Sequence, residues 1–354
     1  IGKPFADGGA FYRSKKTRES HAGWYVLIGI CAAVPCLMVL VLLLMSADMV
    51  FADLLVRFAG VFRFPVKLLR ILLMLVFGFL SSYCGVRYVQ KHAADIKPSA
   101  GKTAEPLIAI AFTAPIAVLY LLFSAIQIVY LFIGNMQLPA GVTYAEYARR
   151  GFFQLLFVCV LNLAAVLSIQ SYFKENRVLK ALLLAISGCT LIMTASSACR
   201  MLLYIRAYQL TFLRVSVLVA LAVIALLMAG VIAKIVKPQF PLFRYGFVLA
   251  GAVYLVFAFS HVDYFIAAYN LTHTSWEASG EETVDYSYLY TLSTDAAPAI
   301  EKYAGKSGAA DYRKQGWYQL YCEANEEALN ETGLRTYNVS HAVAKQLLME
   351  DNRE

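Results

Sequence analysis

Long apolar runs separated by short polar segments dominate much of the chain. Because the hydrocarbon core of a bilayer is crossed by about 20 apolar residues in a helix, each run of that length predicts a membrane-spanning helix. Seven such runs lie at 24–46, 68–88, 106–134, 151–173, 179–204, 212–235 and 244–265. A helix satisfies its own backbone hydrogen bonds, which lipid cannot do. The pattern therefore predicts an all-α, polytopic helical membrane protein whose transmembrane domain covers 24–265.

The segment 47–64, between the first two runs, has a helical period but is too polar to cross a bilayer. Its apolar residues recur at helical spacing, at Val50, Leu54, Phe58 and Val61. This pattern predicts an amphipathic helix that lies in the membrane interface. A basic segment, 1–23, precedes the first run. The chain opens with Ile1 rather than Met, which indicates either processing or a fragment of a longer protein. We favour the fragment and expect further N-terminal spans before it.

The C-terminal segment 266–354 is acidic, polar and aromatic, and it predicts a small helical domain outside the membrane. A helix is expected over 309–331, with its inner face at Tyr312, Trp317, Leu320, Tyr321, Ala324 and Ala328. A shorter helix is expected after Thr294. Ser340 is placed to cap a last helix that runs to 350.

The composition excludes several classes of protein. The chain is 60% hydrophobic and only 15% charged, whereas a soluble domain is usually about a quarter charged. A water-soluble globular enzyme and a disordered chain are therefore ruled out. Six of the seven cysteines lie in apolar runs and no Cys-x-x-Cys pair occurs. We thus expect neither a metal site nor a bound cofactor.

Charge is unevenly distributed and predicts the orientation. Residues 1–265 carry 24 Lys and Arg against 9 Asp and Glu, whereas 266–354 carry 7 against 14. The basic residues flank apolar runs, which is typical of membrane-edge anchors rather than of a nucleic-acid surface. The membrane side that holds the N-terminal segment has 15 Lys and Arg near span ends, and the other side has 9. The richer side is expected to be cytoplasmic, so seven spans place the C-terminal domain outside.

Arginine and tyrosine residues gather at the predicted outer ends of spans four, five and six. The candidate ligand-binding residues are Tyr144, Tyr147, Arg149, Arg200, Tyr204, Tyr208 and Arg214. Tyr204 and Tyr208 follow Arg200 at intervals of four and share one helix face. One interpretation is an aromatic belt with arginines that reach the interface. The other is a site for an anionic head group or carboxylate, which the planar guanidinium fork of arginine binds well.

Other polar residues fall inside or beside the spans. Arg200 lies about one turn inside its span, where a charge is costly unless it is paired or hydrated. Asp48, Asp53 and Asp263 are on the same predicted side and are its candidate partners. His261 and Asp263, at the end of the seventh run, point to different helix faces and match no metal-binding signature. The deep polar residues are Gln127, Asn162, Gln170, Ser196 and Ser197.

Two motifs carry a resemblance to a known family. Tyr144-x-x-Tyr147-x-Arg149-x-Gly151-Phe152-Phe153-x-Leu155 is the first, and Arg200-x-x-Leu203-Tyr204-x-x-x-Tyr208-x-Leu210-Thr211-x-x-Arg214 is the second. Together with Ser46-Ala47-Asp48-x-x-Phe51, Asn270 and Ser293-Thr294-Asp295-Ala296-x-Pro298, they resemble the bacterial polytopic family called domain of unknown function 4153 and its relative 4173. The family usually has Gly, a residue suited to tight turns, where this chain has Gln209. The resemblance implies a bacterial plasma membrane protein and assigns no activity.

Three functions stay open at this point. The leading hypothesis is a non-enzymatic accessory or signalling subunit that binds an anionic lipid, a small anion or a membrane-protein partner at its outer face. The second is a small-solute transporter or lipid flippase with a polar path through the deep residues. The third, an intramembrane enzyme using His261 and Asp263, is ranked last because the chain holds no recognised catalytic motif.

Overall fold

The computed structural model describes residues 21–59, 104–129, 152–273, 275–276, 282–283, 286–304, 312–330 and 338–349. Six described helices are long and apolar enough to cross a membrane. They are α2 (His21–Ala47), α5 (Pro106–Gln127), α7 (Phe152–Tyr172), α8 (Arg177–Tyr208), α9 (Phe212–Val236) and α10 (Leu242–Phe259). They confirm the all-α polytopic fold, and the protein is a multi-pass membrane protein. The predicted span 68–88 lies outside the described residues.

Contacts divide the chain into two compact units. Unit 1 contains α2, the short helix α3 (Met49–Ala59), α5, α7, α8 up to Ser197 and α9 from Ile224. Unit 2 contains the remaining ends of α8 and α9, then α10 from Phe243 onward, and all that follows. This division follows packing rather than the membrane, so the sequence-based domain boundaries stay predictions.

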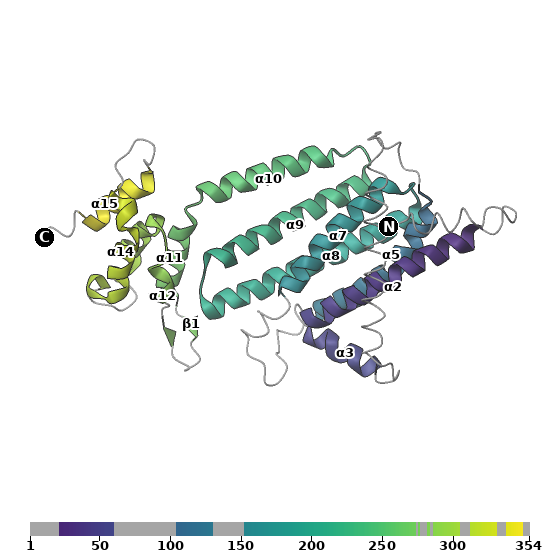
Figure 1. Ribbon diagram of the computed structural model, residues 1–354, viewed down its shortest axis with the longest axis horizontal. Helices are drawn as coiled ribbons and strands as arrows, with labels where there is room; N and C mark the ends of the chain where they lie inside the picture. The colour runs from purple at the N-terminus through teal and green to yellow at the C-terminus, as the bar shows by residue number, and fades with distance from the viewer. Residues whose placement is uncertain are drawn as a thin grey trace, which may run out of the picture. The chain divides into compact units, whose positions relative to one another are not determined.

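Unit 1 is held together by close packing of long helices. Leu44, Phe51 and Phe123 are among its fully buried core side chains. The rings of Phe51 and Phe123 meet edge to face, with centroids 5.1 Å apart, and join α3 to α5. A Cβ atom at Gly29 of α2 would lie 2.5 Å from Ala111 Cβ of α5. Small residues allow helix backbones to approach this closely in membranes, and Figure 1 shows α2 running along α5.

The helix α3 forms within the segment 47–64, where the sequence predicts an amphipathic helix, and 60–64 lie outside the described residues. It begins one residue after α2 ends, and Figure 1 shows it turning away from the end of α2. Asp48 separates the two helices, and its Oδ1 accepts a hydrogen bond from the Phe51 amide at 2.9 Å. This is an N-cap, which satisfies one of the open amides at the start of a helix.

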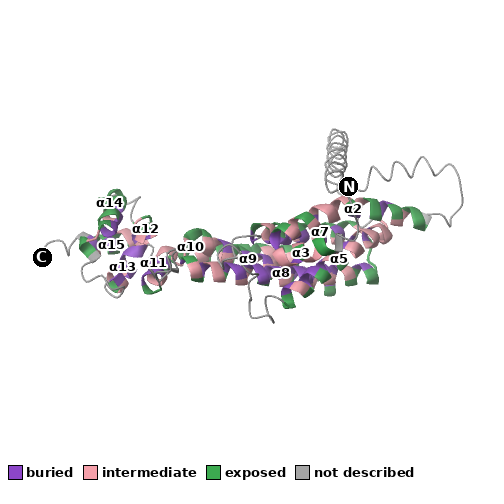
Figure 2. Ribbon diagram, turned by 90° about the horizontal axis from the view of Figure 1, so that it is seen from below, coloured by how far each residue is buried: buried purple, intermediate pink, exposed green. Residues whose placement is uncertain are grey.

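Unit 2 gathers short helices around its own core. After α10 come α11 (Val262–Thr272), α12 (Tyr286–Leu289), η2 (Thr294–Ala296), α13 (Ala297–Tyr303), η4 (Tyr312–Lys314), α14 (Gly316–Asn330) and α15 (Val339–Met349). A two-residue antiparallel pair, β1 (Ser275–Trp276) with β2 (Glu282–Thr283), adds the only described strands. Figure 2 shows buried residues between α11 and α15 and exposed ones on their outer faces.

Three sequence-based expectations for this unit were wrong in detail. The seventh predicted span, 244–265, is broken at Ser260 and His261, because His261 has a left-handed backbone with φ of 46°. The predicted helix 309–331 is α14, preceded by η4. The last helix is capped by Asn338, whose Oδ1 accepts from the Ser340 amide at 2.9 Å, and not by Ser340 itself.

The buried face of α14 also differs from the predicted one. Trp317 and Tyr321 are buried as expected, but Leu320 is 48% exposed. Asn325, a polar residue, takes a place in the core instead. Its Nδ2 donates to the carbonyls of Leu292 at 3.1 Å and Tyr321 at 3.0 Å. Apolar periodicity cannot identify this position, because the residue is buried for its hydrogen bonds.

Candidate functional site

The turn between α8 and α9 is the centre of the candidate site. The helix α8 ends at Tyr208, and Gln209 then adopts φ of 63°, in the left-handed region. Glycine adopts this region without strain, whereas other residues rarely do. A tight turn is therefore present here with Gln209, at the position where the resemblance led us to expect Gly. Arg214 Nη1 donates to the carbonyl oxygens of Tyr208 and Gln209, which the end of a helix leaves open.

Three of the predicted ligand-binding residues come together beside this turn. The rings of Tyr204 and Tyr208 lie 5.0 Å apart between centroids. The Arg214 guanidinium lies 4.4 Å from the centre of the Tyr204 ring, a distance at which a cation is attracted to the ring face. Tyr208 is 43% exposed. The structure thus forms an aromatic and cationic cluster of Tyr204, Tyr208 and Arg214, which we call the turn cluster.

Arg200 differs from the three residues of the turn cluster because it has no exposed surface. It lies one turn before Tyr204 on α8 and is 0% exposed. A buried guanidinium is a poor first contact for a ligand from outside, and removing a buried charge partner is strongly destabilising. Of its candidate partners, Asp53 forms an ion pair with Arg57 at 2.9 Å. The pairing of Arg200 with one of the predicted aspartates stays a prediction.

The remaining predicted residues, Tyr144, Tyr147 and Arg149, lie outside the described residues.

Asn270 clamps the turn from α11. Its Oδ1 accepts from the Leu210 amide at 2.8 Å and its Nδ2 donates to the Leu210 carbonyl at 2.9 Å. The Gln209 Nε2 donates in turn to the His273 carbonyl at 2.7 Å. Asn270 is 1% exposed and Gln209 is 2% exposed. Buried amides bonded in this way fix the turn to α11.

Tyr288, which the sequence analysis missed, adds a second connection. Its hydroxyl oxygen accepts from the Phe212 amide at 3.0 Å, at the first residue of α9. The start of α9 is thereby bonded to α12. No sequence pattern indicated this pairing, because Phe212 and Tyr288 are 76 residues apart in the chain.

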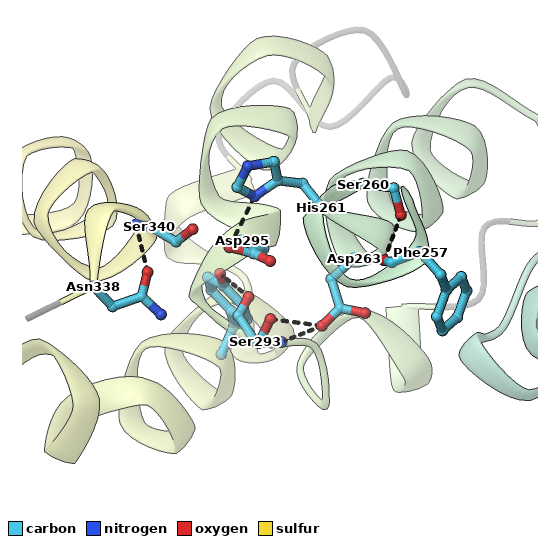
Figure 3. A network of polar contacts seen from close by, with 9 residues as sticks. Phe257, Ser260, His261, Asp263, Ser293, Asp295, Asn338 and Ser340 are labelled. Atoms are coloured by element: carbon cyan, nitrogen blue, oxygen red, sulfur yellow. Dashed lines mark hydrogen bonds and ion pairs between the residues drawn. The ribbon is translucent and has the colours of Figure 1, made fainter. Parts of the chain in front are cut away.

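His261 and Asp263 have separate partners, as Figure 3 shows. Asp263 Oδ2 accepts from the amide and the hydroxyl of Ser293, at 3.1 and 2.6 Å. His261 Nδ1 lies 3.3 Å from Asp295 Oδ1. The two side chains therefore bind the loop that Ser293 and η2 form before α13 at different points. This geometry counts against the hypothesis that they act as one catalytic pair.

The same loop is fixed from α14. The Tyr321 hydroxyl donates to the Ser293 carbonyl at 2.9 Å, and burial raises the pKa of this hydroxyl above its usual range. Ser293 and Asp295 belong to the tail motif of the resemblance. In the structure their contacts join α11, the loop and α14 into one body.

The deep polar residues of unit 1 form two hydrogen-bonded groups. In the first, Gln127 Nε2 donates to Asp48 Oδ2 at 2.9 Å, and the Ser196 hydroxyl donates to Gln127 Oε1 at 2.6 Å. The three side chains are at most 3% exposed. The group thus joins the α2–α3 junction, α5 and α8.

The second group joins α5, α7 and α8. The Tyr120 hydroxyl donates to Asn162 Oδ1 at 2.6 Å, and Asn162 Nδ2 donates to the Thr190 hydroxyl at 2.9 Å. Of the other predicted deep residues, Ser197 is buried and Gln170 is partly exposed. Three of the five are therefore bonded between helices, the usual role of such residues in membranes.

No group of three or more His, Cys, Asp or Glu side chains that could hold a metal ion occurs among the residues that the structure describes.

The fold is that of a multi-pass helical membrane protein. Its short C-terminal helices are hydrogen-bonded to the turn between α8 and α9. The chain matches the family described as Domain of unknown function (DUF4153) over residues 1–303. This match covers most of the chain, so the protein belongs to that family, as the motifs indicated. The family description identifies no catalytic activity. No curated protein and no solved structure matches the chain.

Proposed function

We propose that this protein is a non-enzymatic accessory or signalling component of the bacterial plasma membrane. It binds an anionic ligand, which is a lipid head group, a small anion or an acidic segment of a membrane-protein partner. The binding surface is the turn cluster at the outer face, with Tyr144, Tyr147 and Arg149 as its predicted extension. Arg200 supports the cluster from within the helix.

The single observation that carries the proposal is the placement of Arg214. Its guanidinium is held over Tyr204, and its bonds to the turn carbonyls both use Nη1. A guanidinium has five donors in a fixed plane, so its remaining edge is oriented for a phosphate or carboxylate. Preorganised arginine loses little conformational entropy on binding such groups. The exposed Tyr208 ring lies at the same place.

The bonds around the turn connect this surface to the helical domain. A ligand that shifts the Arg214 side chain also displaces the carbonyls of Tyr208 and Gln209, to which Arg214 is hydrogen-bonded. Gln209 is in turn hydrogen-bonded to the His273 carbonyl at the end of α11. Binding would thus bias the position of α11. This supports a sensing or accessory role over simple anchoring.

Native mass spectrometry of the protein, extracted from its own membrane, tests the proposal. We expect the wild type to retain an anionic lipid, a small anion or a second polypeptide, and Arg214→Gln to lose it. Arg206→Gln, at an exposed position on α8 between Tyr204 and Tyr208, is the matched control and should retain it. If Arg214→Gln fails to fold, Arg214→Lys, which keeps the charge but lacks the planar fork, replaces it. Unchanged retention in a folded Arg214 variant would overturn the proposal.

Transport or lipid flipping is the second candidate, and the two buried polar groups of unit 1 favour it. A path for a polar solute needs polar side chains between helices, and Gln127 and Asn162 supply them. Uptake of solute or movement of labelled lipid in proteoliposomes tests this function. Loss of flux in Gln127→Leu and Asn162→Leu, with binding at the turn cluster unchanged, would favour transport over the accessory role.

A further inference from the structure

A groove of about 640 Å³ opens in unit 1 at the opposite end of α8 from the turn cluster. It lies where α7 ends, α8 begins and α9 ends, and these helix ends mark one edge of the membrane-spanning region. Its lining has two kinds of residue. Leu167, Leu183 and Ile235 are among the apolar ones, and Lys174, Arg177, Lys180 and Lys234 are the basic ones.

The basic side of the groove is only partly neutralised. Lys174 Nζ forms an ion pair with Glu105 at 2.8 Å. Lys180 and Lys234 donate to the carbonyls of Val236 and Pro238, which leaves their charges in place. Within the described ranges, Arg177, Lys180 and Lys234 form no ion pair with a carboxylate. Glu175 is the acidic residue of the lining, so the groove keeps an excess of positive charge.

The volume and the two-sided lining fit one class of ligand. Ligand sites usually have volumes of about 300–1,000 Å³, so the groove holds a head group and the start of its chains. A soluble anion would bind the lysines but would leave the apolar side chains of the lining exposed to water. A phospholipid with an anionic head group satisfies both sides. Basic pockets between membrane helices on the cytoplasmic side are typical binding sites for such lipids.

We propose that this groove binds an anionic phospholipid, with its phosphate at Lys180, Lys234 and Arg177 and its acyl chains against the apolar side. The positive-inside pattern places this edge in the cytoplasmic leaflet. The site is separate from the turn cluster and does not depend on it. The bound lipid bridges the ends of α7, α8 and α9.

The test uses the full chain in nanodiscs of phosphatidylcholine with a minor fraction of phosphatidylglycerol. Lipid that remains after transfer to detergent is counted by native mass spectrometry. The wild type is expected to retain phosphatidylglycerol in preference to phosphatidylcholine. Lys180→Gln with Lys234→Gln should lower this retention about 30-fold, because each basic residue near the membrane surface adds roughly 1 kcal/mol of attraction and every 1.4 kcal/mol is a tenfold change.

Lys237→Gln with Arg244→Gln is the matched control. It removes the same charge from exposed positions at the same membrane edge that do not line the groove. The control is expected to retain phosphatidylglycerol as the wild type does. Equal losses in both double variants would show a diffuse charge effect and overturn the proposal. Equal retention of the two lipids by the wild type would overturn it as well.

Two further arms complete the test. Glycerol 1-phosphate, the free head group, should not compete with the lipid, and tight binding of it would reassign the groove to a soluble anion and overturn the lipid proposal.

Lys234 supports the turn after α9, so its removal can impair folding. In that case Lys180→Gln alone should still lower retention by a few fold, and unchanged retention in that variant would overturn the proposal.

Discussion

The buried asparagine and glutamine side chains of the two units have different kinds of partner. In unit 1, Asn162 bonds to side chains of two other helices. Gln127 bonds to the side chains of Asp48, at the α2–α3 junction, and of Ser196 on α8. In unit 2, Asn270 and Asn325 bond to backbone groups. The difference follows from helix length. Long helices satisfy their own backbone, so only side chains are left to pair, whereas short helices and turns expose amides and carbonyls that side chains must satisfy.

This contrast predicts unequal costs for removing the polar groups. In unit 1 a deletion removes a bond between two side chains, and both can be replaced together. In unit 2 a deletion leaves a backbone group that no substitution can remove. The unsatisfied group then bears its full desolvation penalty.

The largest effect is expected for Asn270→Ala. It leaves the Leu210 amide and carbonyl without partners, which should cost about 2–6 kcal/mol at one to three for each of the two groups. The helical domain should then show faster amide hydrogen exchange at α11 and the turn. Asn270→Asp, which keeps the acceptor only, should fall between wild type and Asn270→Ala. An Asn270→Ala protein with wild-type exchange and thermal stability would contradict the clamp.

Gly29→Ala should have the next largest effect and sharpens the account of unit 1. The added Cβ would lie 2.5 Å from Ala111 Cβ and 2.6 Å from the Ile108 carbonyl oxygen, so α2 must move away from α5. Overpacking of this kind costs about 1–3 kcal/mol. Gly23→Ala on the same helix, with nothing within 4 Å of the new Cβ, is the control. Thermal unfolding in detergent should separate the two variants, and equal stabilities would refute the close approach.

Asn162→Leu should cost about 1 kcal/mol, within the range measured for side-chain hydrogen bonds between membrane helices. It leaves the Tyr120 hydroxyl without its acceptor. Adding Tyr120→Phe removes that hydroxyl, so the double variant should regain part of the loss. If the double variant regains no stability, the hydrogen-bonded group of Tyr120, Asn162 and Thr190 has a role beyond joining the helices.

The smallest effect is expected for Gln209→Gly. Glycine relieves the left-handed strain at φ of 63° but loses the bond to His273, so the two effects should nearly cancel, within about 1 kcal/mol. Gln209→Ala keeps the strain and loses the bond, and it should be less stable than Gln209→Gly. The order of the two melting temperatures checks this prediction, and the reverse order would exclude strain at the turn.

Hydropathy predicted the long helices well because lipid imposes both their length and their composition. The described ends of α7 and α9 lie within one residue of the predicted spans, which were 151–173 and 212–235. The break at Ser260 and His261 was missed, because neither residue is a Pro or Gly and hydropathy carries no backbone signal. The N-cap of the last helix was also predicted wrongly, because Asn338 and Ser340 are both good N-cap residues and the sequence does not distinguish them.

The candidate site was predicted only in part. The helical spacing of Tyr204 and Tyr208 placed them on one face, and their rings do meet. The contacts of Arg214 with the turn carbonyls depend on the left-handed Gln209, which spacing alone does not predict. The partners Asn270 and Tyr288 come from elements 60 or more residues further along the chain, and local patterns do not indicate such pairings.

The position of Asn270 has a consequence for producing this protein. Asn270, Leu271 and Thr272 form an Asn-x-Thr acceptor for N-linked glycans. The nitrogen that a glycosyltransferase would modify is the Nδ2 that donates to Leu210, and the side chain is buried. A sugar attached there during secretion in a eukaryotic host would prevent the clamp from closing. Bacterial expression, or a Thr272→Ala variant in eukaryotic cells, avoids this conflict.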